Sequence, residues 1–299
     1  MNRRGNDSQN KWGLINYTMK KQQIAILGLQ ETHPSEEMRQ TIGKKLRNTL
    51  HLIHSADPDD PSKMGGVTVA INKGIVNIKD ISHSVVIPGR VIMIELPWNE
   101  RDKLHIMNVC APANNANKVA FWRALQGIVE ENDDLKPDVL MGDLNLVENP
   151  EMDRLNNSRG ADPQAAWTAM SDLMVELNLT DGWRRRHPKK RGFTFTGNGQ
   201  LRLDRIYTKE ELYPWCTNWR IEHPGFKTDH NIVSVQITSE NMLFIGKGRW
   251  AIPVNLLKNK TLKKRTQELA RQLEMEVEQI PQQDNLTNPQ IALKFSKQI

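Results

Sequence analysis

The chain has 299 residues, a formal net charge of +6 and 38% hydrophobic residues, which together indicate a soluble globular protein of one or two domains. Two isolated cysteines exclude a disulfide scaffold and a zinc ribbon, and fit a reducing compartment. No apolar run approaches the roughly 18 residues of a membrane helix, and the polar N-terminus lacks the apolar core of a secretory signal. We therefore expect a protein that is not secreted and has no membrane partner.

Short apolar segments that predict strands recur through the first 240 residues. Residues 24–29 form a continuous apolar run, which is typical of a strand covered on both faces. Further strands are predicted at residues 66–71, 91–96, 104–110, 138–141, 201–207 and 232–237. Helical patterns intervene at residues 11–21, after Pro34, and at residues 117–131 and 163–177. Because several consecutive strands have no helix between them, a mixed α/β fold with antiparallel hairpins is predicted.

The character of the sequence changes after Glu240. Residues 241–299 hold ten Lys or Arg against five Asp or Glu, so most of the net charge belongs to this tail. A glycine-rich linker at residues 246–250 precedes a charged helical pattern at residues 256–280. We expect one domain at residues 1–240, and a basic linker and helix at residues 241–299 that lead toward a missing downstream region.

A basic run stands near residue 190. Six of its eight residues carry a fixed positive charge: Arg184, Arg185, Arg186, Lys189, Lys190 and Arg191. Such a run is a solvated loop or a nuclear-import signal in one interpretation. In the other it is a clamp on a phosphate backbone or a strand-insertion loop. The sequence favours neither interpretation over the other.

Polar side chains stand at the ends of several predicted strands. They are Glu31, Asp143, Asn145, Asp204, Asp229 and His230. Taken singly, each has an ordinary structural explanation, such as a surface acid, a turn or a cap. Side chains at strand ends can converge on one edge of a sheet, where α/β proteins place their sites. Carboxylate and amide oxygens suit Mg²⁺ or Mn²⁺, so the set suggests metal-assisted phosphodiester hydrolysis.

An ordered set of motifs carries a family resemblance: Asn2-x-x-Gly5, Leu29-Gln30-Glu31-Thr32, Gly142-Asp143-Leu144-Asn145, Leu203-Asp204-Arg205-Ile206 and Thr228-Asp229-His230. The set resembles the endonuclease/exonuclease/phosphatase superfamily. The resemblance covers about residues 1–260. It implies a four-layer α/β sandwich of two packed mixed β-sheets flanked by helices, as in DNase I, with the site at one end.

Within the superfamily, the chain looks most like the AP-endonuclease-like domain of non-LTR (LINE-type) retrotransposons. The segments that match this branch are residues 30–33, 65–70, 108–112 and 193–195. Residues 246–250 resemble the segment that follows the domain in fungal elements, before the reverse transcriptase.

The resemblance also implies roles for the metal ligands. Glu31 would be the main ligand of Mg²⁺, with Mn²⁺ as an alternative ion. Asn2 would lie beside Glu31 and contact phosphate or metal-bound water. Asp229 would sit near the metal.

The other implied roles concern proton transfer and phosphate. Asp143 would transfer a proton, and Asn145 would orient the attacking water or the phosphate. His230 would contact the scissile phosphate while Asp204 holds its ring in one tautomer. Whether His230 acts as a base or as a cationic anchor stays open. Two hydroxyl groups, those of Thr194 and Thr228, would donate hydrogen bonds to phosphate.

The function implied is a Mg²⁺-dependent endonuclease that nicks target DNA for retrotransposition. Its partners would be DNA and a reverse transcriptase domain of the parent element, and its location the nucleus. One alternative is an abasic-site repair nuclease or another phosphoesterase of the superfamily. The other is a catalytically decayed relic.

Three departures from the family pattern support the interpretation that the chain is a catalytically decayed relic. Met1 directly precedes Asn2, where the family has a strand, so a truncated start is expected. Cys110 stands where a phosphate-binding Tyr is usual. Arg4 replaces an oxygen-bearing side chain and cannot bind a metal.

Overall fold

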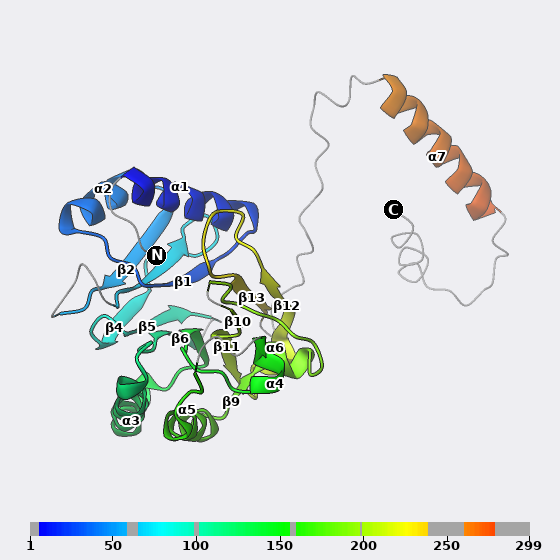
Figure 1. Ribbon diagram of the computed structural model, residues 1–299. Coiled ribbons are helices and arrows are strands. Elements are labelled where there is room, and N and C mark those ends of the chain that lie inside the picture. Colours follow the sequence, from blue (N-terminus) through cyan, green and yellow to red (C-terminus); the bar gives the residue numbers. More distant parts are fainter. Residues whose placement is uncertain are drawn as a thin grey trace. The chain divides into compact units, whose positions relative to one another are not determined.

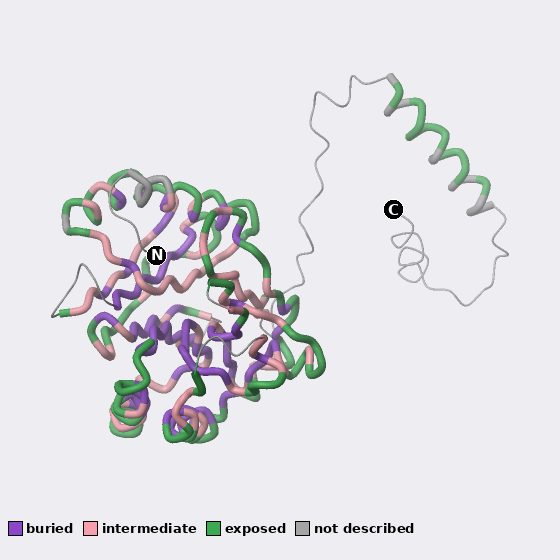
Figure 2. The backbone as a smooth tube through the Cα atoms, viewed as in Figure 1, coloured by how far each residue is buried: buried purple, intermediate pink, exposed green. Residues whose placement is uncertain are grey.

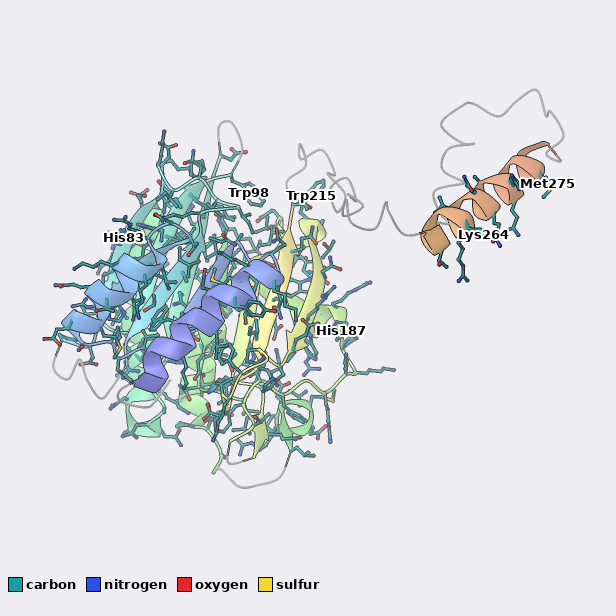
Figure 3. All side chains as sticks on the ribbon, turned by 90° about the horizontal axis from the view of Figure 1, so that it is seen from above. His83, Trp98, His187, Trp215, Lys264 and Met275 are labelled. Atoms are coloured by element: carbon teal, nitrogen blue, oxygen red, sulfur yellow. The ribbon has the colours of Figure 1, made fainter. Side chains whose placement is uncertain are left out.

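The computed structural model describes residues 6–58, 65–98, 102–155, 160–197, 199–238 and 260–278. The chain divides into two compact units, Met1–Met242 and Leu243–Ile299. Helix α7 (Lys260–Glu278) is the element described in the second unit, and side chains such as those of Lys264 and Met275 project from it (Figure 3). Asn2 and Arg4 lie outside the described residues, so the expectations about them stay predictions.

The first unit is built in four layers (Figure 1). Helices α1 (Asn6–Lys21) and α2 (Glu36–Leu46) cover one sheet layer. Helices α3 (Asn115–Glu131) and α5 (Gln164–Glu176) cover the other. This arrangement confirms the predicted α/β sandwich. Among the described residues, no helix combines the length and the apolar character that crossing a lipid bilayer requires.

The larger sheet has six strands in the order β4-β5-β6-β7-β11-β9. Their bounds are Ser82–Ile87, Val91–Pro97, Lys103–Cys110, Val139–Asp143, Asp204–Lys209 and Leu179–Asp181, in that order. The pair β6–β7 is parallel and the other pairs are antiparallel. A parallel pair needs a long crossover, which α3 supplies here.

The other sheet layer consists of two pieces. One has the order β1-β3-β2, formed by Ile26–Gln30, Val67–Asn72 and Leu50–Ser55. The other pairs β12 (Cys216–Glu222) with β13 (Ile232–Ile237). All of these described pairs are antiparallel, so the larger sheet is the mixed one.

Short elements complete the unit. They are η1 (Asp133–Leu135), α4 (Pro150–Asp153), β8 (Arg154–Leu155), α6 (Gly182–Arg186), β10 (Gln200–Leu201) and η2 (Tyr213–Trp215). Strands β8 and β10 pair with each other. The strand predicted at residues 201–207 is divided in the structure, because β10 ends at Leu201 and β11 begins at Asp204.

The core fills the spaces between the layers. In β5, Val91 and Met93 pack toward the helices of the larger sheet, while Ile92 and Ile94 pack toward the other sheet layer. Both faces of this strand are buried, which explains its continuous apolar run. Figure 2 shows buried residues concentrated in the interior strands and exposed residues on the outer helix faces.

Strand β7 approaches β6 closely at Gly142. This glycine has a φ of +140°, and a Cβ added to it would lie 1.9 Å from the carbonyl oxygen of Val109. We expect Gly142→Ala to lower the free energy of unfolding by about 3 kcal/mol, because the strands must separate. Urea unfolding measures the change. The control is Gly127→Ala in α3, where the added Cβ meets nothing within 4 Å and helix propensity predicts a gain of about 0.5–1 kcal/mol. Equal stability of both variants would contradict the close approach.

Candidate active site

The ends of neighbouring strands place three side chains in one row at an edge of the larger sheet. Cys110 ends β6, Asp143 ends β7 and Asp204 begins β11. Cys110 lies opposite Asp143 in the strand register, and Asp143 lies opposite Asp204. Directly opposed residues point to the same face of a sheet. The row therefore projects toward the space between the two sheet layers, where Cys110 packs.

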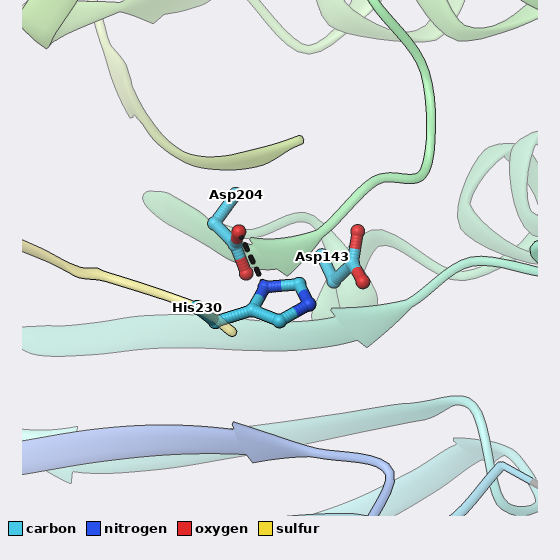
Figure 4. Close-up of side chains that lie close together, drawn as sticks. All are labelled: Asp143, Asp204 and His230. Atoms are coloured by element: carbon cyan, nitrogen blue, oxygen red, sulfur yellow. Dashed lines mark hydrogen bonds and ion pairs between the residues drawn. The ribbon is translucent and has the colours of Figure 1, made fainter. Parts of the chain in front are cut away.

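The imidazole of His230 enters this row from the segment before β13. Its Nδ1 lies 2.9 Å from Oδ2 of Asp204, and Phe195 contacts the ring edge-on at a centroid distance of 5.2 Å. The ring lies between the carboxylates of Asp204 and Asp143 (Figure 4). One ligand atom from each of Asp143, Asp204 and His230 falls within 4.8 Å of the others. These three predicted residues therefore meet in space.

Glu31 comes to the same region from the opposite layer, directly after β1. Its backbone has a φ of +52°, a left-handed conformation that is uncommon outside glycine and is found at functional sites. One carboxylate oxygen lies 3.1 Å from Nε2 of His33, and the other accepts from the Cys110 thiol at 3.6 Å. With 43% of the side chain exposed, the carboxylate stays open to solvent.

The turn after β7 is fixed by the Asp143 and Asn145 side chains. The backbone N–H of Asn145 donates to Oδ1 of Asp143 at 2.9 Å, and its side-chain amide donates to the carbonyl of Ala111 at 2.8 Å. Asn145 has a φ of +50°. Its amide group thus holds the loop after β6 against the loop after β7, beside the row of polar side chains.

Burial and charge set the protonation of the centre. Burial raises the pKa of Asp143 to about 7; the charge of Asp204 adds to the rise, and the charge of His230 opposes it. Burial lowers the pKa of His230, but its hydrogen bond to Asp204 and the nearby carboxylates outweigh that effect and raise it to about 9. At neutral pH the imidazole is therefore a cation. Asp143 is a carboxyl group that gains or loses its proton near neutrality.

The donor set fits a divalent cation. Glu31 offers a solvent-accessible carboxylate, and the fields of Glu31 and Asp204 both raise the pKa of Asp143. Two other carboxylates therefore act on Asp143, and a bound cation would relieve the repulsion among the three groups. Carboxylate oxygens are the ligands that Mg²⁺ takes in proteins.

Three other predicted residues lie near this centre. Thr194 is fully buried, and its hydroxyl oxygen accepts from the backbone N–H groups of Leu203 and Asp204 at 2.9 Å each. It therefore anchors the start of β11, and its expected contact with phosphate stays a prediction. Thr228 accepts from the N–H of His230 at 3.3 Å and stays partly exposed, while Asp229 is exposed.

Half of the basic run is bound to the protein itself. Arg184 pairs with Asp153 and donates to the carbonyl of Lys190, and Arg185 pairs with Glu210. Arg191 donates to the carbonyl of Glu151. The other half is Arg186, Lys189 and Lys190, whose exposed side chains form no ion pair among the described residues. Arg184 and Arg185 thus have carboxylate partners, whereas the expectation that the six basic residues clamp a phosphate backbone stays a prediction.

A buried ionic network supports the start of β11 and is not apparent in the sequence. Arg202 is 1% exposed and donates to Asp153 at 2.8 Å and to Asp181 at 2.5 Å. Arg205 is also buried, with carboxylate oxygens at 3.7–3.9 Å. These arginines flank Asp204 and fix the strand that carries it. The carboxylate partners of the two arginines, such as Asp153 and Asp181, are distant in sequence. No local pattern therefore predicts the network.

A model of a protein family described as the endonuclease/exonuclease/phosphatase family matches residues 14–230. The match covers more than half of the chain. It includes Glu31, Asp143, Asp204 and His230.

Among curated proteins, the chain is similar to the "Transposon TX1 uncharacterized 149 kDa protein" of Xenopus laevis. The two are 25% identical over 215 residues, which are 70% of this chain and 16% of that relative. The chain thus spans about one sixth of the relative's length.

Solved structures give a likeness of fold. An AP endonuclease from Archaeoglobus fulgidus is 17% identical with a TM-score of 0.62, over 77% of this chain and 95% of that one. The endonuclease domain of TRAS1, a telomere-specific non-LTR retrotransposon, is 13% identical with a TM-score of 0.53, over 75% and 90%.

Proposed function

Because the chain belongs to the endonuclease/exonuclease/phosphatase family, we propose that it is a DNA endonuclease that hydrolyses phosphodiester bonds with Mg²⁺, or alternatively with Mn²⁺. We further propose that it nicks target DNA for a retroelement. One relative is a transposon protein, and one structural neighbour is a retrotransposon endonuclease domain. In the parent element a reverse transcriptase would be its partner, and the nucleus its place of action.

One observation carries the proposal. The Asp204–His230 pair and the buried Asp143 lie together at one sheet edge, and Glu31 faces them from the other layer. This arrangement supplies a metal ligand, a proton acceptor near neutral pKa and a cation within one small site. Metal-assisted phosphodiester hydrolysis can use all three functions.

Metal binding, proton transfer and phosphate binding are assigned to different side chains of the site. Glu31 would hold the cation, which would neutralise charge on the phosphate. Asp143 as a carboxylate accepts the proton of the attacking water as the new P–O bond forms and the bond to the leaving oxygen breaks, and the leaving oxygen takes a proton from solvent. The His230 imidazolium, held by Asp204 at 2.9 Å, donates a charge-assisted hydrogen bond to the phosphate. A base role for His230 is disfavoured because its pKa is about 9.

Nicking of supercoiled plasmid tests the proposal. We expect the full chain to nick with Mg²⁺ and not with EDTA, and the Glu31→Ala/His230→Ala double variant to be inactive. A duplex carrying an abasic site, assayed beside its intact counterpart, separates a repair nuclease from a nicking endonuclease. A folded wild-type chain that is inactive on every substrate with both ions would be a decayed copy, and the proposal would be wrong.

The exposed part of the basic run is proposed to contact the DNA backbone. Replacing Arg186, Lys189 and Lys190 together by Gln is expected to weaken DNA binding and to lower the slope of log Kd against log salt by up to about 3, because each phosphate contact releases about one counterion. Fluorescence anisotropy across a salt series measures the slope. The control is Arg123→Gln on the exposed face of α3. A slope unchanged in the triple variant would identify these side chains as solvated.

A further inference from the structure

A pocket with a volume of about 510 Å³ lies between α2 and strand β2. Helix α2 contacts β2 on the outer side of the sheet layer (Figure 1), and β2 is an edge strand that pairs with β3 alone among the described strands. In this register Leu52 lies opposite Ala70 and His54 opposite Thr68, on the face that packs toward α1 and α2. The candidate active site lies between the sheet layers. The pocket is therefore a separate feature, and its volume is within the range of ligand sites.

One wall of the pocket is a face of α2 that carries two arginines with a glycine between them. Arg39, Gly43 and Arg47 are four residues apart, so they share this face, and all three line the pocket. Arg47 caps the helix and keeps helical backbone angles. A Cβ added to Gly43 would meet nothing within 4 Å. Glycine is a poor helix former, and here it leaves open the space between two guanidinium groups.

Lys73 adds a third fixed positive charge to the pocket. It follows β3, and its Nζ donates to the carbonyl of Arg47 at 2.7 Å. This bond ties the end of the strand to the end of α2 and holds the ammonium group beside the pocket. No acidic residue is among the described residues that line the pocket. The three cations therefore have no carboxylate between them in its lining.

The field at this end of the pocket is positive. Burial lowers the pKa of His51, which also lines the pocket, and the charges of Lys73 and His83 lower it further. A positive field of this kind favours a bound anion.

The interior of the pocket is apolar. It is lined by Trp12 from α1, by Ile42 and Leu46 from α2, and by Leu50 from β2, and all four side chains are buried. A matching ligand therefore needs an apolar body for the interior and negative charge for the cations. A nucleoside phosphate has both. Its planar base packs on apolar and aromatic side chains, and its phosphate pairs with guanidinium and ammonium groups.

We propose that the pocket between α2 and β2 binds a nucleoside phosphate, with the phosphate at Arg39, Arg47 and Lys73 and the base in the apolar interior. The choice of a nucleotide over another amphipathic anion rests on the proposed function, because a protein that cleaves DNA meets this chemistry in every strand. The nucleotide is either free or part of a single strand. The competing explanation is that the pocket is a gap in the packing of α2 on β2 and binds nothing.

Isothermal titration calorimetry with dAMP in EDTA tests the cations of the pocket without metal or hydrolysis. We expect Arg39→Gln/Arg47→Gln to raise Kd about 10- to 100-fold, the range for a lost charge-assisted hydrogen bond. The matched control is Lys44→Gln/Lys45→Gln. It removes the same charge from the same helix, at positions that do not line the pocket. The control should bind dAMP with the wild-type Kd.

Gly43→Leu tests the space inside the pocket. Leucine is a better helix former than glycine, so α2 should stay folded, which thermal unfolding checks. We expect the added side chain to occupy the pocket and to raise Kd for dAMP at least about tenfold. The matched control is Gly127→Leu in α3, where an added Cβ also meets nothing within 4 Å. This control should bind dAMP like the wild type.

Three results would overturn the inference. One is a wild-type chain that does not bind dAMP, and another is wild-type affinity in folded Arg39→Gln/Arg47→Gln or in folded Gly43→Leu. The third is loss of dAMP binding in Glu31→Ala/His230→Ala, which would place the nucleotide in the candidate active site. Competition identifies the source of a nucleotide that does bind in the pocket. Displacement of dAMP by an oligo-dT strand assigns the pocket to a single strand, and its absence assigns the pocket to a free nucleotide.

The proposed function can fail separately. It is judged by plasmid nicking of the wild-type chain against Glu31→Ala/His230→Ala, whereas the pocket is judged by dAMP binding alone. A chain that nicks DNA but does not bind dAMP would end the inference and leave the proposed function in place. A chain that binds dAMP in the pocket but does not nick would sustain the inference and end the catalytic proposal.

Discussion

Replacing Asp143 with Asn is expected to lower the nicking rate about 10³-fold, within the range for loss of a general base. The two side chains have nearly the same shape, but an amide cannot accept a proton at neutral pH. The pKa of Asp143 is about 7 because the group is buried beside Asp204. A carboxylate so placed takes a proton from water more readily than an exposed aspartate. Initial rates on supercoiled plasmid measure the effect.

The stability of Asp143→Asn distinguishes a chemical defect from unfolding. A carboxyl group whose folded-state pKa is raised binds more protons folded than unfolded, so it makes the wild type less stable as pH rises from 3.8 toward 7. The Asn variant carries no such charge and is expected to be the more stable protein at slightly alkaline pH. Asp172→Asn, on the exposed face of α5, serves as the matched control. If Asp143→Asn nicked within tenfold of wild type, proton transfer by Asp143 would be excluded.

The layers of the fold were largely predictable from hydrophobic pattern. Strand β5 reads as a strand because both of its faces are buried. Strand β4 could not be predicted, because it is a mostly exposed edge strand with polar Ser82, His83 and Ser84. Strand β12 has no strict alternation of buried and exposed residues, because its buried residues Cys216 and Trp219 are three positions apart and its register with β13 shifts between them.

The site was predictable where its residues lie next to apolar segments. Glu31, Asp143 and Asp204 stand at the ends of apolar segments, and the resemblance to a family paired Asp204 with His230. Contacts between segments distant in sequence were not predictable. The basic run looked uniform, yet Arg184 reaches Asp153 in the buried network while Lys189 stays exposed. The hydroxyl oxygen of Thr194 accepts from two backbone N–H groups at the start of β11, a contact that has no local signature in the sequence.

Arg90 was not predicted as a neighbour of Glu31, although its guanidinium lies 4.0 Å from a carboxylate oxygen of that residue. An arginine before a predicted strand is most simply a surface residue. Its proximity to Glu31 depends on two sheet layers packing face to face, and on the Gly65 turn that lies against it. Neither feature has a local signature in the sequence.

The pH dependence of nicking should be bell-shaped between the two pKa values of the centre. The rate rises as Asp143 loses its proton through about 7. It falls as His230 loses its proton through about 9. We expect Asp204→Asn to lower the maximal rate about 10³-fold and to move the alkaline limb to lower pH, because the hydrogen bond and the charge that raise the His230 pKa are removed.

A second Asp–His pair in the same protein provides the control. Asp138 lies 3.3 Å from Nδ1 of His105, at the opposite end of β6 from Cys110. Asp138→Asn should leave both limbs of the profile in place, even if the protein loses stability, since neither group faces the row that contains Asp143. If Asp204→Asn kept the wild-type alkaline limb, that limb would belong to another group. His230 would then not be the cation that meets the phosphate.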